Sequence, residues 1–173
     1  MSEAYTNLLE RRSIRKYEDL QVPDALLDAV LAAGIHAPSG MNTQGVRLVA
    51  VRDRETRDLL SRLNAAVMNA DNDPFYGAPC VVVVLADPEI YGGWVEDGSL
   101  ALGNMMNAAH ALGLGSCWIH RAKQVFDSPE GKALLKKWGV PEHYRGVGHC
   151  ILGYAAAELP AAKPRKNDYV VRV

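Results

Sequence analysis

Apolar residues recur at helical spacing in several stretches of this chain. They fall every three or four positions in segments 22–37 and 54–70, which predicts two amphipathic helices. A shorter helix is expected over residues 3–12. The first long helix is expected to end at "APSG", where Pro38 and Gly40 interrupt the pattern.

Continuous β-branched runs predict strands between these helices. The run "CVVVVLAD" has no polar residue until its end, which is typical of a strand covered on both faces. A further helix is expected over 128–140, with Ser128 as its N-cap. The expected strands are 46–53, 80–87, 116–120 and 146–156.

The uncharged segment 98–118 is long enough to be tested as a membrane span. It contains several glycines, and Asn104, Asn107 and His110 place polar groups at every third position. These polar groups favour a buried helix of a water-soluble protein. Helices followed by alternating strands and helices then predict one α/β or α+β domain over residues 1–173, with helices on both faces of a sheet.

Composition excludes several classes of protein. The formal net charge is −1 over 173 residues, which gives no support for general nucleic-acid binding. Three cysteines without a CxxC pair argue against a disulfide framework, and the five histidines show no metal-binding spacing, so no metal is expected. The N-terminus lacks an apolar signal segment, and the expected location is the cytoplasm.

Positive charge nevertheless gathers near the two ends of the chain. Four of the seven residues in "RRSIRKY" (11–17) are cationic, and "KPRKND" (163–168) adds a second cluster. Guanidinium groups beside a hydroxyl suit a phosphate, which the two clusters would neutralise together if the fold brings them close. A solvated basic surface explains each cluster equally well when it is taken alone.

Two uncharged loops offer further binding groups. "APSGMNTQ" (37–44) carries amide and hydroxyl groups that suit the edge of a heteroaromatic ring, although ordinary turn chemistry also explains it. "GLGSCW" (113–118) follows a helix and precedes a strand, which is the reverse of a dinucleotide-binding glycine loop. It reads either as a glycine-terminated helix or as a close approach of the backbone to a ligand.

Six stretches in this order resemble the FMN-dependent nitroreductase family. They are "RRSIRKY", "HAPSGMNTQ", "FYGAPCVVVV", "LGNMMNAAHALGLGSCWI", "GHCILGY" and "PRKNDY", and they span nearly the whole chain. The resemblance implies an α+β fold with a central mixed β-sheet flanked by helices. It also implies a homodimer with the C-terminal segment exchanged toward the partner, and FMN at the interface.

The resemblance assigns roles in FMN binding to particular residues. The FMN phosphate would contact Arg11 and Ser13 of the RRS motif and the Arg165–Lys166 pair of the PRK cluster. The flavin ring would lie near Arg15 and against the glycine turn at 113–115. The PSxxNxQ loop at 38–44 would come from the other subunit. The expected FMN-binding residues are Arg11, Arg12, Ser13, Arg15, Pro38, Ser39, Asn42, Gln44, Asn64, Gly113, Leu114, Gly115, Arg165 and Lys166.

The implied function is an oxidoreductase that takes a hydride from NAD(P)H and reduces nitroaromatic or quinone-type acceptors by a ping-pong mechanism. The flavin would carry the chemistry, so no catalytic side chain is expected, and Phe75 and Tyr76 are the expected lining of the substrate pocket. Relatives with other flavin chemistry (dehalogenation, azoline oxidation, flavin destruction) and a non-catalytic FMN-binding protein remain as alternatives.

Overall fold

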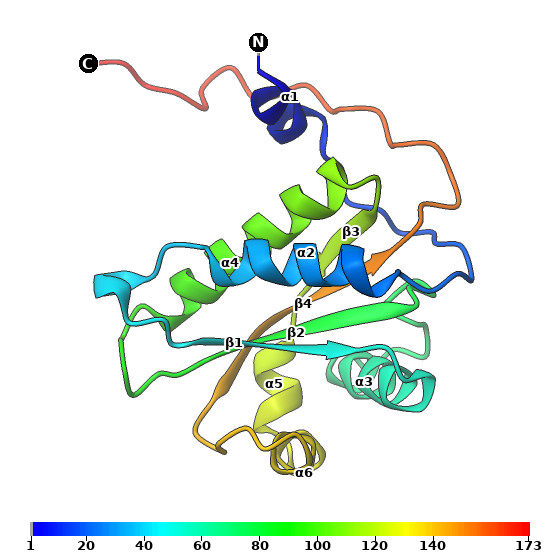
Figure 1. Cartoon of the computed structure of the whole chain (residues 1–173), viewed down its shortest axis with the longest axis vertical. Helices are drawn as coiled ribbons and strands as arrows, with labels where there is room; N and C mark the ends of the chain where they lie inside the picture. The colour runs from blue at the N-terminus through cyan, green and yellow to red at the C-terminus, as the bar shows by residue number, and fades with distance from the viewer. Residues whose placement is uncertain (1) are drawn as a thin grey trace.

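The computed structural model describes residues 2–173 and contains one four-stranded sheet with helices on both faces (Figure 1). The strand order is β1-β2-β4-β3. The elements are α1 (Glu3–Glu10), α2 (Asp24–Ile35), the 3₁₀ turn η1 (Gly40–Asn42), β1 (Val46–Val51), α3 (Arg54–Val67), β2 (Cys80–Ala86), α4 (Trp94–Ala111), β3 (Gly115–Ile119), α5 (Ala122–Asp127), α6 (Pro129–Lys137) and β4 (Arg145–Gly153).

The α+β class is confirmed, but the strands pair differently from the expected mixed sheet. All three strand pairs are antiparallel, and the parallel contact among the described residues is a single bridge between Ser13 and Ser116. The reason lies in the connections. After α3, the segment 68–79 brings the chain back to the end of the sheet where β1 finishes. Strand β2 therefore starts beside the end of β1, and Val51 of β1 lies opposite Val81 of β2.

The sheet separates two apolar cores. Helices α2 and α4 cover one face, and α3, α5 and α6 cover the other (Figure 1). Strand β2 is buried along its whole length, as its β-branched run predicts, because alternate side chains enter the two cores. Removing this apolar surface from water is the main favourable contribution to the stability of the fold.

Local signals at the helix ends agree with the sequence. Ser128 caps α6, its hydroxyl accepting a hydrogen bond from the Gly131 N–H at 3.1 Å, and Asp53 caps α3 in the same way. Helix α4 begins earlier than expected, and α5 was not anticipated. Within residues 2–173, no helix combines the length and apolarity that a bilayer crossing needs.

The C-terminal tail forms no helix or strand. Residues 157–173 are exposed, and the tail leaves the end of β4 and extends toward the end of the molecule that carries α1 (Figure 1). Its last residues include exposed apolar side chains, among them Tyr169 and Val171. Apolar groups held in water in this way lack the burial that stabilises the rest of the chain.

Candidate functional site

The RRS segment lies along the start of β3. The Ile14 N–H donates to the Ser116 carbonyl at 3.0 Å, next to the bridge between Ser13 and Ser116. Gly115 permits this approach, because an added Cβ would lie 3.0 Å from three side-chain atoms of Ile14. Arg11, Arg12, Ser13 and Arg15 are thus fixed to the sheet rather than carried on a free terminus.

Arg11 carries a buried donor without a partner. Among residues 2–173, nothing accepts a hydrogen bond from its Nη1 atom. Arg12 is engaged differently, since its Nη1 donates to the carbonyls of Leu9 at 2.8 Å and Arg11 at 2.9 Å, at the end of α1. A buried, unpaired guanidinium nitrogen is costly, and an anion would satisfy it. Arg11 therefore fits the expected phosphate contact.

A cavity of about 210 Å³ opens at the far end of β3. It contains Arg15 and Tyr76, both expected in the site, and no acidic residue lines it. Sequence reasoning missed His120 and Arg121, which follow β3 directly. The lining residues are Arg15, Met68, Asn72, Pro74, Tyr76, Cys117, Trp118, Ile119, His120 and Arg121.

Asn64 holds the turn after β3 that lines this cavity. It is fully buried on α3, its Nδ2 donates to the His120 carbonyl at 2.8 Å, and its Oδ1 accepts from Arg121 Nε at 3.2 Å. Arg121 has a φ of 74°, in the left-handed region that residues other than glycine seldom occupy. In this structure Asn64 holds the turn after β3 instead of presenting its amide to the cavity.

The expectation that Phe75 lines an open pocket is wrong. Its ring is fully buried, 5.2 Å from the ring centre of His149 and beneath the Arg57 guanidinium. Asp73 causes this by accepting hydrogen bonds from the N–H groups of Phe75 and Gly77, which turns the loop inward. Tyr76 between them stays 40% exposed and lines the cavity.

The glycine turn before β3 ends a helix, as one of the two readings predicts. Gly113 has a φ of 75°, and the Leu114 N–H donates to the Ala109 carbonyl at 2.8 Å, which closes the end of α4. Leu114 itself is buried in the core beneath α2 and α4. The motif therefore sets where β3 begins, and through Gly115 it sets where the RRS segment packs.

The 37–44 loop forms a separate part of the surface. Pro38, Ser39 and Gln44 line a second cavity of about 210 Å³, which shares no residue with the cavity at Arg15. The loop is held by Asp97, which accepts from the Gly40 N–H at 2.8 Å, while Asn42 accepts from Gln44 Nε2. One chain alone does not bring this loop to Arg15.

The second basic cluster lies in the exposed C-terminal tail. Arg165 and Lys166 are exposed there, and within residues 2–173 neither side chain forms a hydrogen bond or an ion pair. Their convergence on one phosphate remains a prediction.

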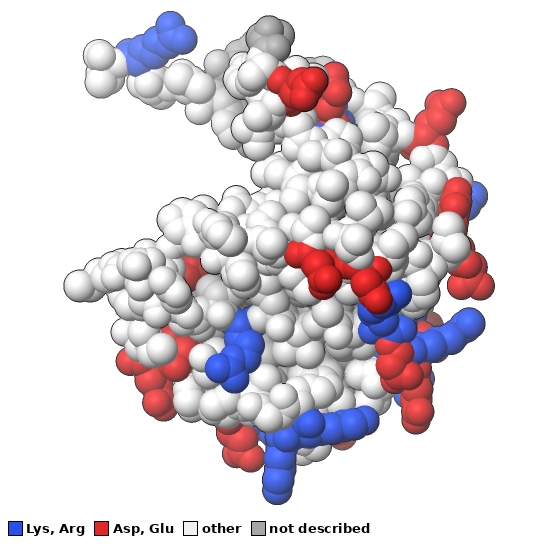
Figure 2. Space-filling model, viewed as in Figure 1, with Lys and Arg blue, Asp and Glu red and all other residues white. Residues whose placement is uncertain are grey.

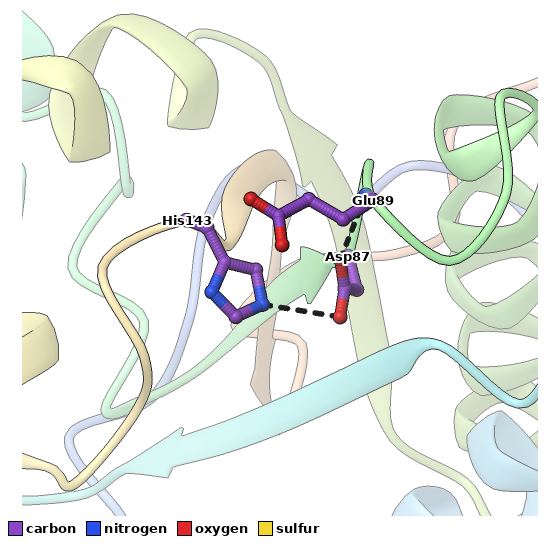
Figure 3. Close-up of side chains that lie close together, drawn as sticks. All are labelled: Asp87, Glu89 and His143. Carbon is purple, nitrogen blue, oxygen red and sulfur yellow. Dashed lines mark hydrogen bonds and ion pairs between the residues drawn. The ribbon is translucent and has the colours of Figure 1, made fainter.

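Asp87, Glu89 and His143 form the one group of potential metal ligands found within residues 2–173 (Figure 3). Asp87 already has a partner for each oxygen, since Oδ2 lies 3.1 Å from His143 Nε2 and Oδ1 accepts from the Glu89 N–H at 2.8 Å. Asp87 follows β2 and takes no part in either cavity described above. The group is complete as a capped turn with a hydrogen bond between Asp87 and His143.

Comparison with known proteins places the chain in a family. The model of the nitroreductase family matches residues 8–154. The chain belongs to the nitroreductase family. A Thermus thermophilus protein named NADH dehydrogenase is 39% identical over 164 residues, covering 91% of this chain and 72% of its own length. A Bacillus subtilis protein named FMN reductase [NAD(P)H] is 29% identical, with 95% and 70% covered.

The fold of this nitroreductase-family chain matches solved structures over its full length. The crystal structure of a Bacteroides fragilis nitroreductase with bound FMN superposes with a TM-score of 0.91. It is 32% identical in sequence and covers 100% of both chains. The order of the six sequence motifs therefore identified the family and the fold correctly.

Proposed function

We propose that this chain is an FMN-dependent oxidoreductase that takes a hydride from NAD(P)H and reduces nitroaromatic or quinone-type acceptors by a ping-pong mechanism. The observation that carries the proposal is the unpaired, buried Nη1 of Arg11 beside Ser13, which provides a cationic donor with no partner inside residues 2–173. Family membership supports it, since the Bacteroides fragilis relative binds FMN and the Bacillus subtilis relative is an FMN reductase.

The residues of this chain bind and orient the cofactor. Arg11 and Ser13, joined by Arg165 and Lys166, hold the phosphate dianion through charge-assisted hydrogen bonds. Arg15 lines a cavity without acidic residues, and its charge there would stabilise negative charge on a bound flavin ring. FMN, when bound, supplies the two-electron chemistry that links the nicotinamide donor to the acceptor. No side chain needs to form a covalent bond.

A homodimer completes the site in this proposal. The face in Figure 2 has a largely uncharged area that is hollowed beneath α1, and a cleft of about 820 Å³ lies between α1 and α4. Leu8, Leu9 and Leu100 are each about half exposed, which leaves apolar surface for a partner to cover. The partner then contributes the 37–44 loop, and the tails exchange between subunits. The three buried free cysteines suit the reducing cytoplasm.

Purified protein tests the proposal directly. It should be yellow with stoichiometric FMN, and the flavin absorbance should bleach anaerobically on addition of NADH or NADPH. Arg11→Ala should raise the Kd for FMN about 10- to 100-fold, the cost of a lost charge-assisted contact. Arg62→Ala removes an exposed arginine of α3 and serves as the charge-matched control.

Three results would count against the proposal. If the double variant Arg11→Ala/Arg165→Ala retained stoichiometric FMN, the phosphate site would be wrong. If bound FMN resisted reduction by both nicotinamides, the protein would be a flavin-binding protein without this activity. A flavin-loaded monomer in sedimentation experiments would remove the shared site.

A further inference from the structure

The 37–44 loop has a strained backbone. Met41, Asn42 and Gln44 have φ values of 52°, 57° and 53°, in the left-handed region that residues other than glycine seldom adopt. Figure 1 shows the loop (cyan) projecting beyond the end of α2, and Met41 is 88% exposed. Strain of this kind persists only where surrounding contacts hold it, and it is typical of segments that bind a ligand.

The ring of Tyr91 packs against this loop and against the start of α4. A Cβ added to Gly40 would lie 2.0 Å from Tyr91 Cε1, and one added to Gly93 would lie 2.4 Å from the same atom. Neither glycine is required by its own backbone, because neither has a φ in the left-handed region. The ring excludes side chains at both positions, so the two glycines allow Tyr91 to fix the loop to α4.

Hydrogen bonds complete the hold on the loop. The buried Asp97, in the first turn of α4, accepts from the Gly40 N–H at 2.8 Å. Ser39 satisfies two more amides, since its carbonyl accepts from the Asn42 N–H and its Oγ accepts from the Gln44 N–H, both at 3.0 Å. All of these contacts come from the loop's own chain, so the strained shape is held from within one subunit.

We propose that Tyr91 and Asp97 are positioning residues, which hold the 37–44 loop in the shape that binds the flavin of the partner subunit. This rests on the proposed function, in which the partner contributes that loop. A loop that is already ordered loses little conformational entropy on binding, so this clamp of Tyr91 and Asp97 raises the affinity for FMN. Both residues act through the loop and take no part in electron or proton transfer.

Hydrogen exchange of the full chain tests the clamp without flavin. The amides of residues 40, 42, 43 and 44 all donate hydrogen bonds within the chain, so peptides over 38–45 should exchange slowly in FMN-free wild type. Exchange there should be about 10-fold faster in Tyr91→Ala and Asp97→Ala, while Tyr91→Phe, which keeps the ring, should retain slow exchange. Ile90→Ala removes a half-exposed side chain from the same segment and is the matched control. Peptides of the buried strand β2 should stay protected in every variant, which shows that the fold is intact.

FMN titration measures what the clamp contributes to binding. Tyr91→Ala should raise the Kd for FMN about 10- to 30-fold, whereas Tyr91→Phe and Ile90→Ala should bind FMN like the wild type. Gly40→Ala should weaken binding in the same way, because its Cβ displaces the ring. In the double variant Gly40→Ala/Tyr91→Ala the added methyl group occupies space that the ring has left, so the two effects should not multiply.

Hybrid dimers show which flavin the loop serves. When Arg11→Ala lies in one subunit and Tyr91→Ala in the other, both changes fall on one site, and the dimer should keep one FMN with the wild-type Kd. When both changes lie in the same subunit, each site carries one of them, and neither site should bind FMN with the wild-type Kd. A loop that served the flavin of its own subunit would exchange these two results. A general loss of stability would not depend on the arrangement.

Three results would overturn the proposal. They are unchanged exchange over 38–45 in Tyr91→Ala, an unchanged Kd for FMN despite faster exchange, and the exchanged pattern in the hybrid dimers. Wild-type protein that bound no FMN would be a failure of the proposed function. The exchange experiment, which is done without FMN, distinguishes that failure from a failure of the clamp.

Discussion

Asp73 organises the loop that places Tyr76 in the cavity, and its removal should destabilise the protein markedly. Its carboxylate accepts hydrogen bonds from Arg57 Nη2 at 2.6 Å, the Ser61 hydroxyl at 2.5 Å, and the N–H groups of Phe75 and Gly77. Burial alone would raise the pKa of Asp73, but the bonds from Ser61 and Arg57 outweigh it and hold that pKa below its usual value.

The expected cost of Asp73→Ala follows from what it leaves behind. The Arg57 side chain is 10% exposed and would keep Asp58 as its only carboxylate partner. Breaking a buried pair costs about 3–5 kcal/mol, but Asp73 is 35% exposed, so solvent reduces this to about 2–4 kcal/mol. For a domain of this size, the melting temperature should fall by about 4–16 °C.

Thermal and urea unfolding at saturating FMN and fixed protein concentration measure this cost, because both conditions hold ligand and subunit linkage constant. Asp58→Ala is the matched control. It removes a carboxylate from the same guanidinium but only one close contact, so it should cost less than about 1 kcal/mol. Equal costs for the two variants would refute the reasoning.

The pH dependence of the free energy of unfolding adds a second check. Since the folded pKa of Asp73 is lowered, its stabilisation should persist above about pH 4 and disappear as the pH falls through the folded pKa.

Two further predictions concern the core. His149 is fully buried, and desolvation by this burial lowers its pKa to about 4. Between pH 6.5 and pH 4 the His149 imidazole gains a proton only in the unfolded state, so the free energy of unfolding of the wild type should fall by about 3 kcal/mol. His149→Leu should not show this loss. Parallel urea titrations of the two proteins across that range check this, and identical pH profiles would contradict it. Gly146→Ala should lower the free energy of unfolding by about 1–3 kcal/mol and therefore the melting temperature, because the added Cβ would lie 2.3 Å from the Ala122 carbonyl oxygen. The control Gly92→Ala places its Cβ where no atom lies within 4 Å, and it should melt like the wild type.

Much of the fold could be predicted from local sequence. The β-branched run of β2 and the capping residues Asp53 and Ser128 mark elements whose existence depends on near neighbours. Strand direction could not be predicted, because segment 68–79 has no periodic pattern that shows where it leads. Helix α5 is too short for a clear helical period.

The candidate site divides in the same way. Arg11, Ser13 and Arg15 could be predicted as site residues because the charge of the two arginines and the spacing of the motif are visible in the sequence. Phe75 and Tyr76 are adjacent and both aromatic, and only the hydrogen bonds of Asp73 decide that one is buried and the other faces the cavity. His120 and Arg121 carried no signal, since their role depends on the backbone turn after β3 and on the contact with Asn64.

By itself, the sequence determined the family, the α+β class, the buried strand and the cationic residues at the two ends of the chain. Those features follow from residue type and short-range spacing, which a linear sequence displays. The tertiary structure alone decided the antiparallel pairing, the burial of Phe75 and the anchoring of Arg121 by Asn64 across 57 positions of chain. These depend on distances between remote segments, which are set when the two cores pack against the sheet.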